Sequence, residues 1–458
     1  MLSLRDTGRF NGANISVIDV AAKCGLNVPF SISSFIRSNC SEDEKKLRLC
    51  VVLFSWGPLN TAEPPFTKKS KSFYENFFLN WENPNGIARF WYKESFGRLK
   101  IEGKVLDWTF VPKDPATVLD KDKNGNLVNT INRNTAIGIA KDTASSQGES
   151  TDNYDGFIAI MGVDTSKYVV NGDNSGSDST FAIGTNHNHT CHEVGHIIGN
   201  INKLFTHSFG LETTGYPGGV YGYPYCIMSA ETYGGAYAYF TPKTASTPEE
   251  GNRGPGFCGG TRAILGWANS IEFDLENENE AEFEIQSLGS NQRNLQVVFI
   301  KKGDRKFFVE YRSSKDENDA AIALLGFDAI VVVGIVSGGI AAGEKDGRHT
   351  TNGTFIGQIS VKFSSPANNT IVNFEPNMGI KILEVKGDSK IVIKIVKNFA
   401  FSLKTYRRTH DIALSDGSSS FQIDGSPDYS VKCALYNKLR EWRISEQPVK
   451  SIRDLVNT

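Results

Sequence analysis

The 458-residue sequence predicts an α+β fold, with a mixed sheet and helices in a first domain and a β-sandwich in a second. In the first domain, residues 45–273, apolar runs of strand length alternate with segments of helical spacing. In the second, residues 274–398, runs rich in β-branched residues are separated by turn signals such as Lys386-Gly387-Asp388. Residues 1–44 form a separate N-terminal segment with helical spacing, and residues 399–458 form a C-terminal extension.

Four segments define the first domain. Leu47–Trp56 and Gly156–Val163 are almost continuously apolar, which is typical of buried strands. Lys71–Trp81 has the spacing of an aromatic-rich helix, and Cys191–Gly199 that of a helix with one apolar side. Because these strands and helices alternate, we expect them to build one sheet with helices packed on it.

The second domain is predicted to consist almost entirely of strands. Asp274–Glu284 alternates acidic with other residues, which predicts an exposed edge strand protected by its charge. Six further strands are predicted, at Leu295–Lys301, Lys306–Arg312, Ala329–Val336, Thr354–Phe363, Ile380–Lys386 and Ser389–Val396. Glu310 and Arg312 share one strand, where they either form an ion pair or contact the first domain.

The two ends of the chain carry helical patterns without a recognisable function. Ile15–Cys24 and Ile32–Arg37 have helical spacing before a charged linker at Ser41–Glu44. A basic amphipathic helix is expected near Cys433–Trp442.

Composition excludes several classes of partner. The net charge of −2 and the 22% of charged residues give no reason to expect binding to nucleic acid or to an anionic membrane. The longest weakly polar run, Ala320–Ala342, contains Asp328 and several glycines, so we expect a buried strand there and no membrane span. We expect a monomer.

The motif with the clearest chemistry is His192-Glu193-Val194-Gly195-His196. Histidines four residues apart lie on the same face of a helix, so both imidazoles can bind one Zn²⁺ ion. Glu193 is then placed to act as the general base toward a metal-bound water. Five of the seven histidines fall between His187 and His207, which favours metal chemistry over a helix that merely contains histidines.

The sequence leaves the third metal ligand open. Gly199 can end the helix in a left-handed turn, as in the longer zincin motif, where the third ligand follows three residues after that glycine. Asn202 occupies this position, and its side-chain carbonyl is a weaker zinc ligand than imidazole or carboxylate. His207 is the alternative third ligand. His187 and His189 are expected to support the site or to lie at the surface.

Two further features have a functional and a structural interpretation. Met228 follows a Gly/Tyr/Pro-rich loop and is expected to form a Met-turn beneath the zinc site, with ordinary core filling as the alternative. Asp120, Asp122 and Asn124 offer oxygen ligands at alternate positions, as in a Ca²⁺-binding loop. The twelfth position of that loop is Ile131 and not Glu, so an ordinary polar surface loop remains the alternative.

The cysteines and glycosylation motifs do not settle the cellular compartment. Cys226 with Cys258, and Cys40 with Cys50, are candidate disulfide pairs, but seven widely spaced cysteines favour unpaired thiols. Asn188 begins a glycosylation triplet beside the predicted metal site, where a glycan would be awkward.

Three segments occur in an order that resembles the immune inhibitor A-type metallopeptidases. They are the aromatic-rich Ala88–Trp108, the HEVGHIIG helix followed by Cys226–Ser229 and Cys258–Trp267, and the strand Phe307–Arg312. Together they cover about residues 48–345. The family usually has Asp at the position of Asn202, so this chain departs from it there.

The resemblance implies a metzincin-like zinc endopeptidase that acts on a protein or peptide. It implies His192 and His196 as zinc ligands and Glu193 as the general base. It also implies an extracellular protein, whereas the absence of a recognisable signal peptide leaves a cytoplasmic location as the alternative. Two other functions fit the motif: a zincin-like scaffold without catalysis that binds a protein or glycan, and a zinc hydrolase that acts on an ester or sugar amide.

Overall fold

The computed structural model describes the greater part of the chain between residues 36 and 397. The described residues are 36–38, 44–56, 69–163, 165, 167–170, 177–202, 223, 225–230, 241–290, 294–303, 305–336, 353–363, 372–375 and 378–397. The predicted helices at Ile15–Cys24 and near Cys433–Trp442 lie outside these residues, as do Cys40 and His207.

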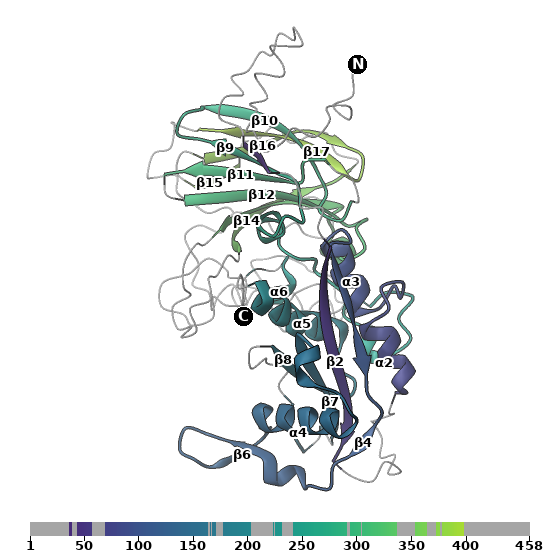
Figure 1. Ribbon diagram of the computed structural model, residues 1–458. Coiled ribbons are helices and arrows are strands. Elements are labelled where there is room, and N and C mark those ends of the chain that lie inside the picture. The colour runs from purple at the N-terminus through teal and green to yellow at the C-terminus, as the bar shows by residue number, and fades with distance from the viewer. Residues whose placement is uncertain are drawn as a thin grey trace, which may run out of the picture.

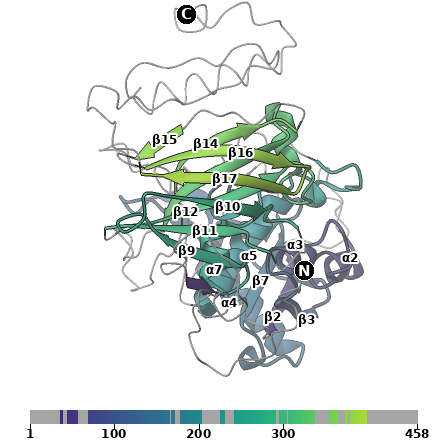
Figure 2. The same cartoon turned by 90° about the horizontal axis from the view of Figure 1, so that it is seen from above.

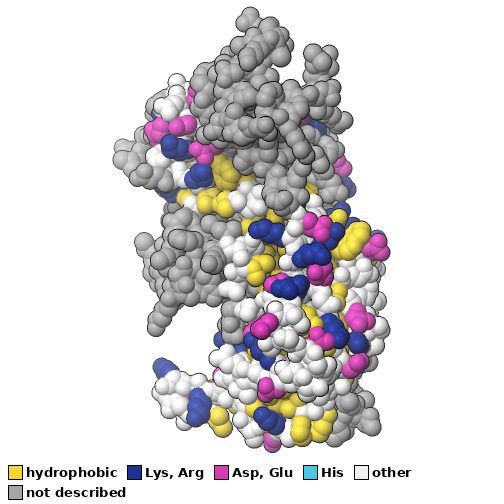
Figure 3. All heavy atoms as spheres, viewed as in Figure 1, with side chains coloured by type: hydrophobic (Ala, Val, Ile, Leu, Met, Phe, Trp, Pro, Cys, Tyr) yellow, Lys and Arg dark blue, Asp and Glu magenta, His cyan; other side chains and the backbone are white. Residues whose placement is uncertain are grey.

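The described chain is a mixed α+β protein with several sheets and few helices, which confirms the predicted class. Figure 1 shows an elongated molecule with a sheet flanked by helices at one end and two stacked sheets at the other. No helix among the described residues is long and apolar enough to cross a membrane. On the face shown in Figure 3, basic and acidic side chains are interspersed over the described surface, without a large patch of either sign.

A parallel sheet forms the first part. Its strands run in the order β3-β2-β7-β8, with β4 beside the end of β2. Their bounds are Lys45–Ser55 (β2), Leu99–Val105 (β3), Thr109–Phe110 (β4), Gly156–Gly162 (β7) and Asp178–Ala182 (β8). Every pairing among these strands is parallel, so the predicted mixed sheet is corrected for this part of the chain. Parallel neighbours need crossover connections, and helices occupy those between β2 and β3 and between β4 and β7.

Helices cover both faces of this sheet, which explains why β2 is almost continuously apolar. Leu49, Val51 and Leu53 pack on one side, with the helices α2 (Lys71–Phe78) and α3 (Ile87–Glu94). The alternate residues of β2 pack on the other side, against α4 (Arg133–Ser146).

The histidine-bearing helix α5 spans His187–Asn202 and is longer than predicted. The side chain of Asn186 accepts a hydrogen bond from the His189 backbone N–H at 3.0 Å, which satisfies one of the amides left unpaired at a helix start. The helix does not end at Gly199 but continues for three more residues. The turn predicted at Gly199 is therefore wrong, because this glycine is buried inside the helix.

The second part contains two sheets. The six-stranded sheet has the order β1-β9-β11-β12-β13-β14, and the four-stranded sheet has the order β10-β17-β16-β15. The first comprises Ile36–Ser38 (β1), Ser270–Asp274 (β9), Val297–Lys302 (β11), Arg305–Ser313 (β12), Ala329–Val336 (β13) and Gly353–Val361 (β14). The second comprises Glu280–Gln286 (β10), Val372–Glu375 (β15), Met378–Lys386 (β16) and Lys390–Val396 (β17).

A shared apolar core joins these two sheets, which lie one above the other in Figure 2. Residues such as Phe283 of β10, Val309 of β12 and Ile393 of β17 belong to this one cluster. The predicted edge strand Asp274–Glu284 is interrupted: β9 ends at Asp274, and β10 begins only at Glu280. Strand β10 lies at the edge of its sheet and alternates exposed with buried residues, as the charge pattern predicts.

Strand β9 belongs to the six-stranded sheet. It begins at Ser270 and pairs in parallel with β11, so the chain enters the second set of sheets before residue 274. Strand β1 pairs antiparallel with β9, where the spacing of Ile32–Arg37 predicts a helix. That prediction is wrong at Ile36 and Arg37, because the edge of β9 supplies backbone partners that the helical pattern does not anticipate.

The two parts also share a core. Trp91 of α3 and Val194 of α5 belong to the same apolar cluster as Phe308 of β12 and Val332 of β13. The short helix α7, Gly259–Ile264, packs against β11, β12 and β13 at this junction. The histidine helix packs against α3 and β8, and its buried residues belong to the same apolar cluster as those of the six-stranded sheet.

Candidate metal centre

The two histidines of the motif face each other across one turn of α5. Their Nε2 atoms are 3.1 Å apart, and both side chains are buried. A tetrahedral Zn²⁺ ion about 2.0–2.1 Å from each imidazole nitrogen would hold the two nitrogens about 3.3 Å apart. The separation between His192 and His196 therefore suits two ligands of one metal ion.

A backbone carbonyl sets the orientation of His192. The Nδ1–H of His192 donates to the carbonyl oxygen of Ile227 at 2.8 Å. In the neutral ring this bond puts the proton on Nδ1 and leaves the lone pair on Nε2, toward His196. Such a second hydrogen bond is the usual support of a metal-binding imidazole.

Glu193 follows His192 directly and is also buried. Its Oε1 atom lies 3.6 Å from Nε2 of His189, one helical turn earlier. His189 is the more exposed of the two side chains, at 28% against 6%. The carboxylate of Glu193 is therefore shielded from solvent, while its neighbour His189 is partly exposed.

Met228 packs against the middle of the motif. It belongs to the single helical turn α6, Ile227–Ala230. A Cβ atom added to Gly195 would lie 2.3 Å from the sulfur of Met228 and 3.1 Å from the Trp91 ring. The glycine therefore allows Met228 to touch the helix backbone between His192 and His196.

Asn202 is not brought to the histidine pair. Its Nδ2 donates to the carbonyl of Ile198 at 2.8 Å, and its Oδ1 accepts from Nζ of Lys45 at 3.0 Å. Asn202 follows His196 by six residues. Because α5 continues past Gly199 to Asn202, this spacing places Asn202 roughly 240° around the helix axis from His196. Within the described ranges no third His, Cys, Asp or Glu joins the pair in a metal-binding group.

The residues proposed for calcium form an ordinary hairpin turn. Asp122 lies between β5 (Leu119–Lys121) and β6 (Leu127–Ile131), and it accepts bonds from the backbone N–H groups of Asn126 and Asn124. These bonds lower the pKa of Asp122, with the Asn126 amide as the largest cause. Asp120 instead accepts from Nδ2 of Asn132, so the carboxylates of the loop do not converge.

His187 is a core residue and not part of the metal centre. Its ring packs edge-on against Phe77 and Phe90. Burial lowers its pKa to about 3, with a further contribution from the positive charge of Arg253. Asn188 is also completely buried, so its glycosylation triplet has no room for a glycan.

The described cysteines are buried thiols, as the spacing favoured. They are Cys50, Cys191, Cys226 and Cys258.

Some of the groups that support the site could not be read from the sequence. The acceptor for His192 is the backbone carbonyl of Ile227, and because every residue has such a carbonyl, no residue type in the sequence points to it. Glu310 and Arg312, by contrast, are predicted to share one strand, and in the structure they both form an ion pair and contact the first part of the chain. No known protein family and no curated protein sequence matches the chain.

Proposed function

We propose that this protein is a zinc-dependent endopeptidase, with a metzincin-like catalytic part followed by a β-sandwich. The observation that carries the proposal is the convergence of the Nε2 atoms of His192 and His196, together with the Nδ1 bond of His192 to the Ile227 carbonyl. The contact between Met228 and Gly195 adds support, because it places a methionine beneath the histidine helix. The stacked sheets with a common core support the β-sandwich.

In this mechanism His192 and His196 would hold Zn²⁺, with the third ligand supplied from outside the described residues, where His207 lies. Bound zinc would lower the pKa of a water molecule toward neutrality. Glu193 accepts a proton from the attacking water and later passes it to the leaving amine of the cleaved peptide. The Ile227 carbonyl keeps His192 in the tautomer that can bind a metal.

The test is hydrolysis of casein and of a peptide library by the zinc-loaded protein and by Glu193→Gln. The substitution keeps the size of the side chain and removes the general base, so the rate should fall by roughly 10²–10⁴. Zinc content should stay the same. Glu102→Gln, at an exposed surface ion pair, is the matched control and should retain full activity. Equal rates for wild type and Glu193→Gln would overturn the proposed role.

A catalytically impaired zincin-like scaffold is the second candidate. The observation that favours it is the side chain of Asn202, which bonds Lys45 and Ile198 and not the histidine pair. Such a scaffold would bind a protein or glycan without cleaving it. It predicts full-length protein that binds zinc weakly and shows no hydrolysis, with no difference between wild type and Glu193→Gln.

A further inference from the structure

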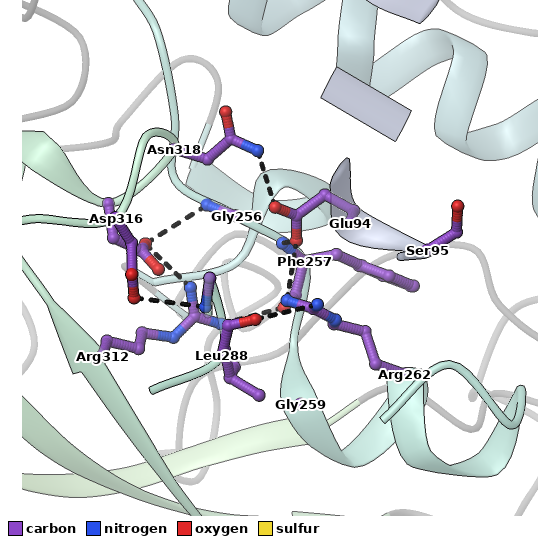
Figure 4. Close-up of polar contacts among 12 residues, drawn as sticks. Glu94, Ser95, Gly256, Phe257, Gly259, Arg262, Leu288, Arg312, Asp316 and Asn318 are labelled. Atoms are coloured by element: carbon purple, nitrogen blue, oxygen red, sulfur yellow. Dashed lines mark hydrogen bonds and ion pairs between the residues drawn. The ribbon is translucent and has the colours of Figure 1, made fainter. Parts of the chain in front are cut away.

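Residues Gly256–Gly259, called the linker below, lead into helix α7, whose first residue is Gly259, and are held by buried charged side chains (Figure 4). The Phe257 N–H donates to Glu94, the last residue of α3. The Phe257 carbonyl accepts from Nη2 of Arg312 on β12 at 3.0 Å. The backbone of Phe257 is thus hydrogen-bonded to Glu94 of the first part of the chain and to Arg312 of the six-stranded sheet.

The charged side chains that hold the linker form one buried network. Arg312 donates through Nε to Glu310 at 2.6 Å and through Nη1 to Asp319 at 2.9 Å. Arg262 donates to Glu94 at 3.3 Å, and Glu310 also accepts from the Gly259 N–H. All five of these charged side chains are buried. Buried ion pairs are a poor way to gain stability, because desolvation offsets their attraction. What they do provide here is a defined position for the linker.

The glycines of the linker allow the carboxylates to approach. A Cβ atom at Gly259 would lie 2.5 Å from Oε2 of Glu310, and one at Gly256 would lie 3.0 Å from the carboxylate of Glu94. The glycine that follows the linker, Gly260, is crowded in the same way by the Phe308 ring. Larger residues at the three glycines of Gly-Phe-Cys-Gly-Gly would therefore push away the side chains that surround the linker.

The linker connects this network to His192 through one residue. The Ile227 N–H donates to the carbonyl of Gly256 at 3.1 Å. The carbonyl of the same Ile227 accepts from Nδ1 of His192 at 2.8 Å. A shift of Gly256 and Phe257 would move Ile227, and the acceptor that sets the tautomer of His192 would move with it.

We propose that Glu94 and Arg312 are positioning residues for the metal centre, because they clamp Phe257 from opposite sides and so fix the Ile227 carbonyl that orients His192. The inference deepens the proposed function and rests on it for the presence of a metal. The hydrogen bond between His192 and the Ile227 carbonyl, however, forms without a bound metal and can be tested separately. The clamp explains why a buried ionic network lies at the junction of the two parts of the molecule.

The test follows the His192 ring in the metal-free, full-length protein labelled with ¹⁵N-histidine. In the wild type, the His192 resonance, assigned with His192→Gln, should show the Nδ1-protonated tautomer with a slowly exchanging proton. Arg312→Lys keeps the charge but loses the planar fork of donors, and Glu94→Asp keeps the charge but shortens the reach. Both variants should lose the slow Nδ1–H signal and bind Zn²⁺ roughly 10–100-fold more weakly. The exposed Glu102→Gln variant should leave both readouts unchanged.

The outcomes separate this inference from the proposed function. Folded Arg312→Lys with an unchanged His192 tautomer and unchanged zinc affinity would overturn the positioning role and leave the zinc site standing. Wild-type protein that binds no zinc, but whose His192 tautomer depends on Arg312, would overturn the proposed function and leave the clamp standing. Hydrogen exchange of the wild type needs no variant: the amides of Ile227 and Phe257 should be as protected as core strands, and rapid exchange there would refute the clamp.

Discussion

Replacing Gly195 with alanine tests whether Met228 really supports the histidine helix. Alanine is favoured over glycine inside a helix by about 1 kcal/mol, so the substitution alone should stabilise α5. In the structure, however, the new methyl group would lie 2.3 Å from the sulfur of Met228, which is itself completely buried. Overpacking of this kind costs about 1–3 kcal/mol. We therefore expect Gly195→Ala to lower the free energy of unfolding by about 0–2 kcal/mol, the difference between these two effects.

A double-mutant cycle isolates the contact. Met228→Ala alone should cost about 2–5 kcal/mol, because it leaves a cavity beneath the helix. With both substitutions, the methyl group introduced by Gly195→Ala no longer meets the sulfur and fills part of that cavity. The double variant should then be no less stable than Met228→Ala, which corresponds to a coupling energy of about 1–3 kcal/mol.

The measurement is urea unfolding of the four proteins, followed by tryptophan fluorescence, since Trp91 borders Gly195. Gly138→Ala is the matched control. Gly138 also lies inside a helix, α4, but a Cβ atom there would meet nothing within 4 Å. This variant should gain up to about 1 kcal/mol. Effects of Gly195→Ala and Met228→Ala that add to within about 0.5 kcal/mol would refute the packing argument.

Two further predictions concern the histidines and the third ligand. Burial lowers the pKa of His187 to about 3 in the folded state, below its value of about 6.5 in the unfolded chain, so the unfolded state binds the extra proton between these values. Stability from the neutral ring is therefore present above pH 6.5 and falls by about 1.4 kcal/mol per pH unit below it, and urea titrations between pH 7 and pH 4 should show a shallower loss for His187→Phe than for wild type. Asn202→Ala should retain its zinc, because the Asn202 side chain bonds Lys45 and Ile198, whereas His207→Ala should lose it; equilibrium dialysis distinguishes the two, and zinc loss in Asn202→Ala alone would reverse the assignment.

The strands of the second part were the most predictable elements. Ala329–Val336 was predicted with the bounds that β13 has, and the charge alternation of β10 predicted its place at a sheet edge. Local patterns suffice there, because a strand with one face in a core must alternate and a strand buried on both faces must be apolar. The parallel arrangement of the first sheet was missed, because strand direction depends on crossovers and not on the strand sequence.

The candidate metal centre was predictable as far as its chemistry is local. His192, Glu193 and His196 are four residues apart or less, so helical periodicity alone places them together. The predicted end of the helix was wrong because glycine can either end a helix or lie inside a buried helix as a small residue. The surrounding structure decides between the two, and Gly199 lies inside α5. The clamp joins Glu94 to Arg312 across more than 200 residues of sequence, and no pattern in one chain links such distant charges.

The central claim is that His192 and His196 bind one zinc ion, and the most direct test is metal content. Full-length protein purified under zinc-replete conditions should contain about one zinc per chain by elemental analysis, as a single pair of converging imidazoles requires. His192→Ala and His196→Ala should each lose it, while Glu193→Gln should keep it. Wild-type protein that holds no zinc under these conditions, or histidine variants that hold as much as the wild type, would contradict the account.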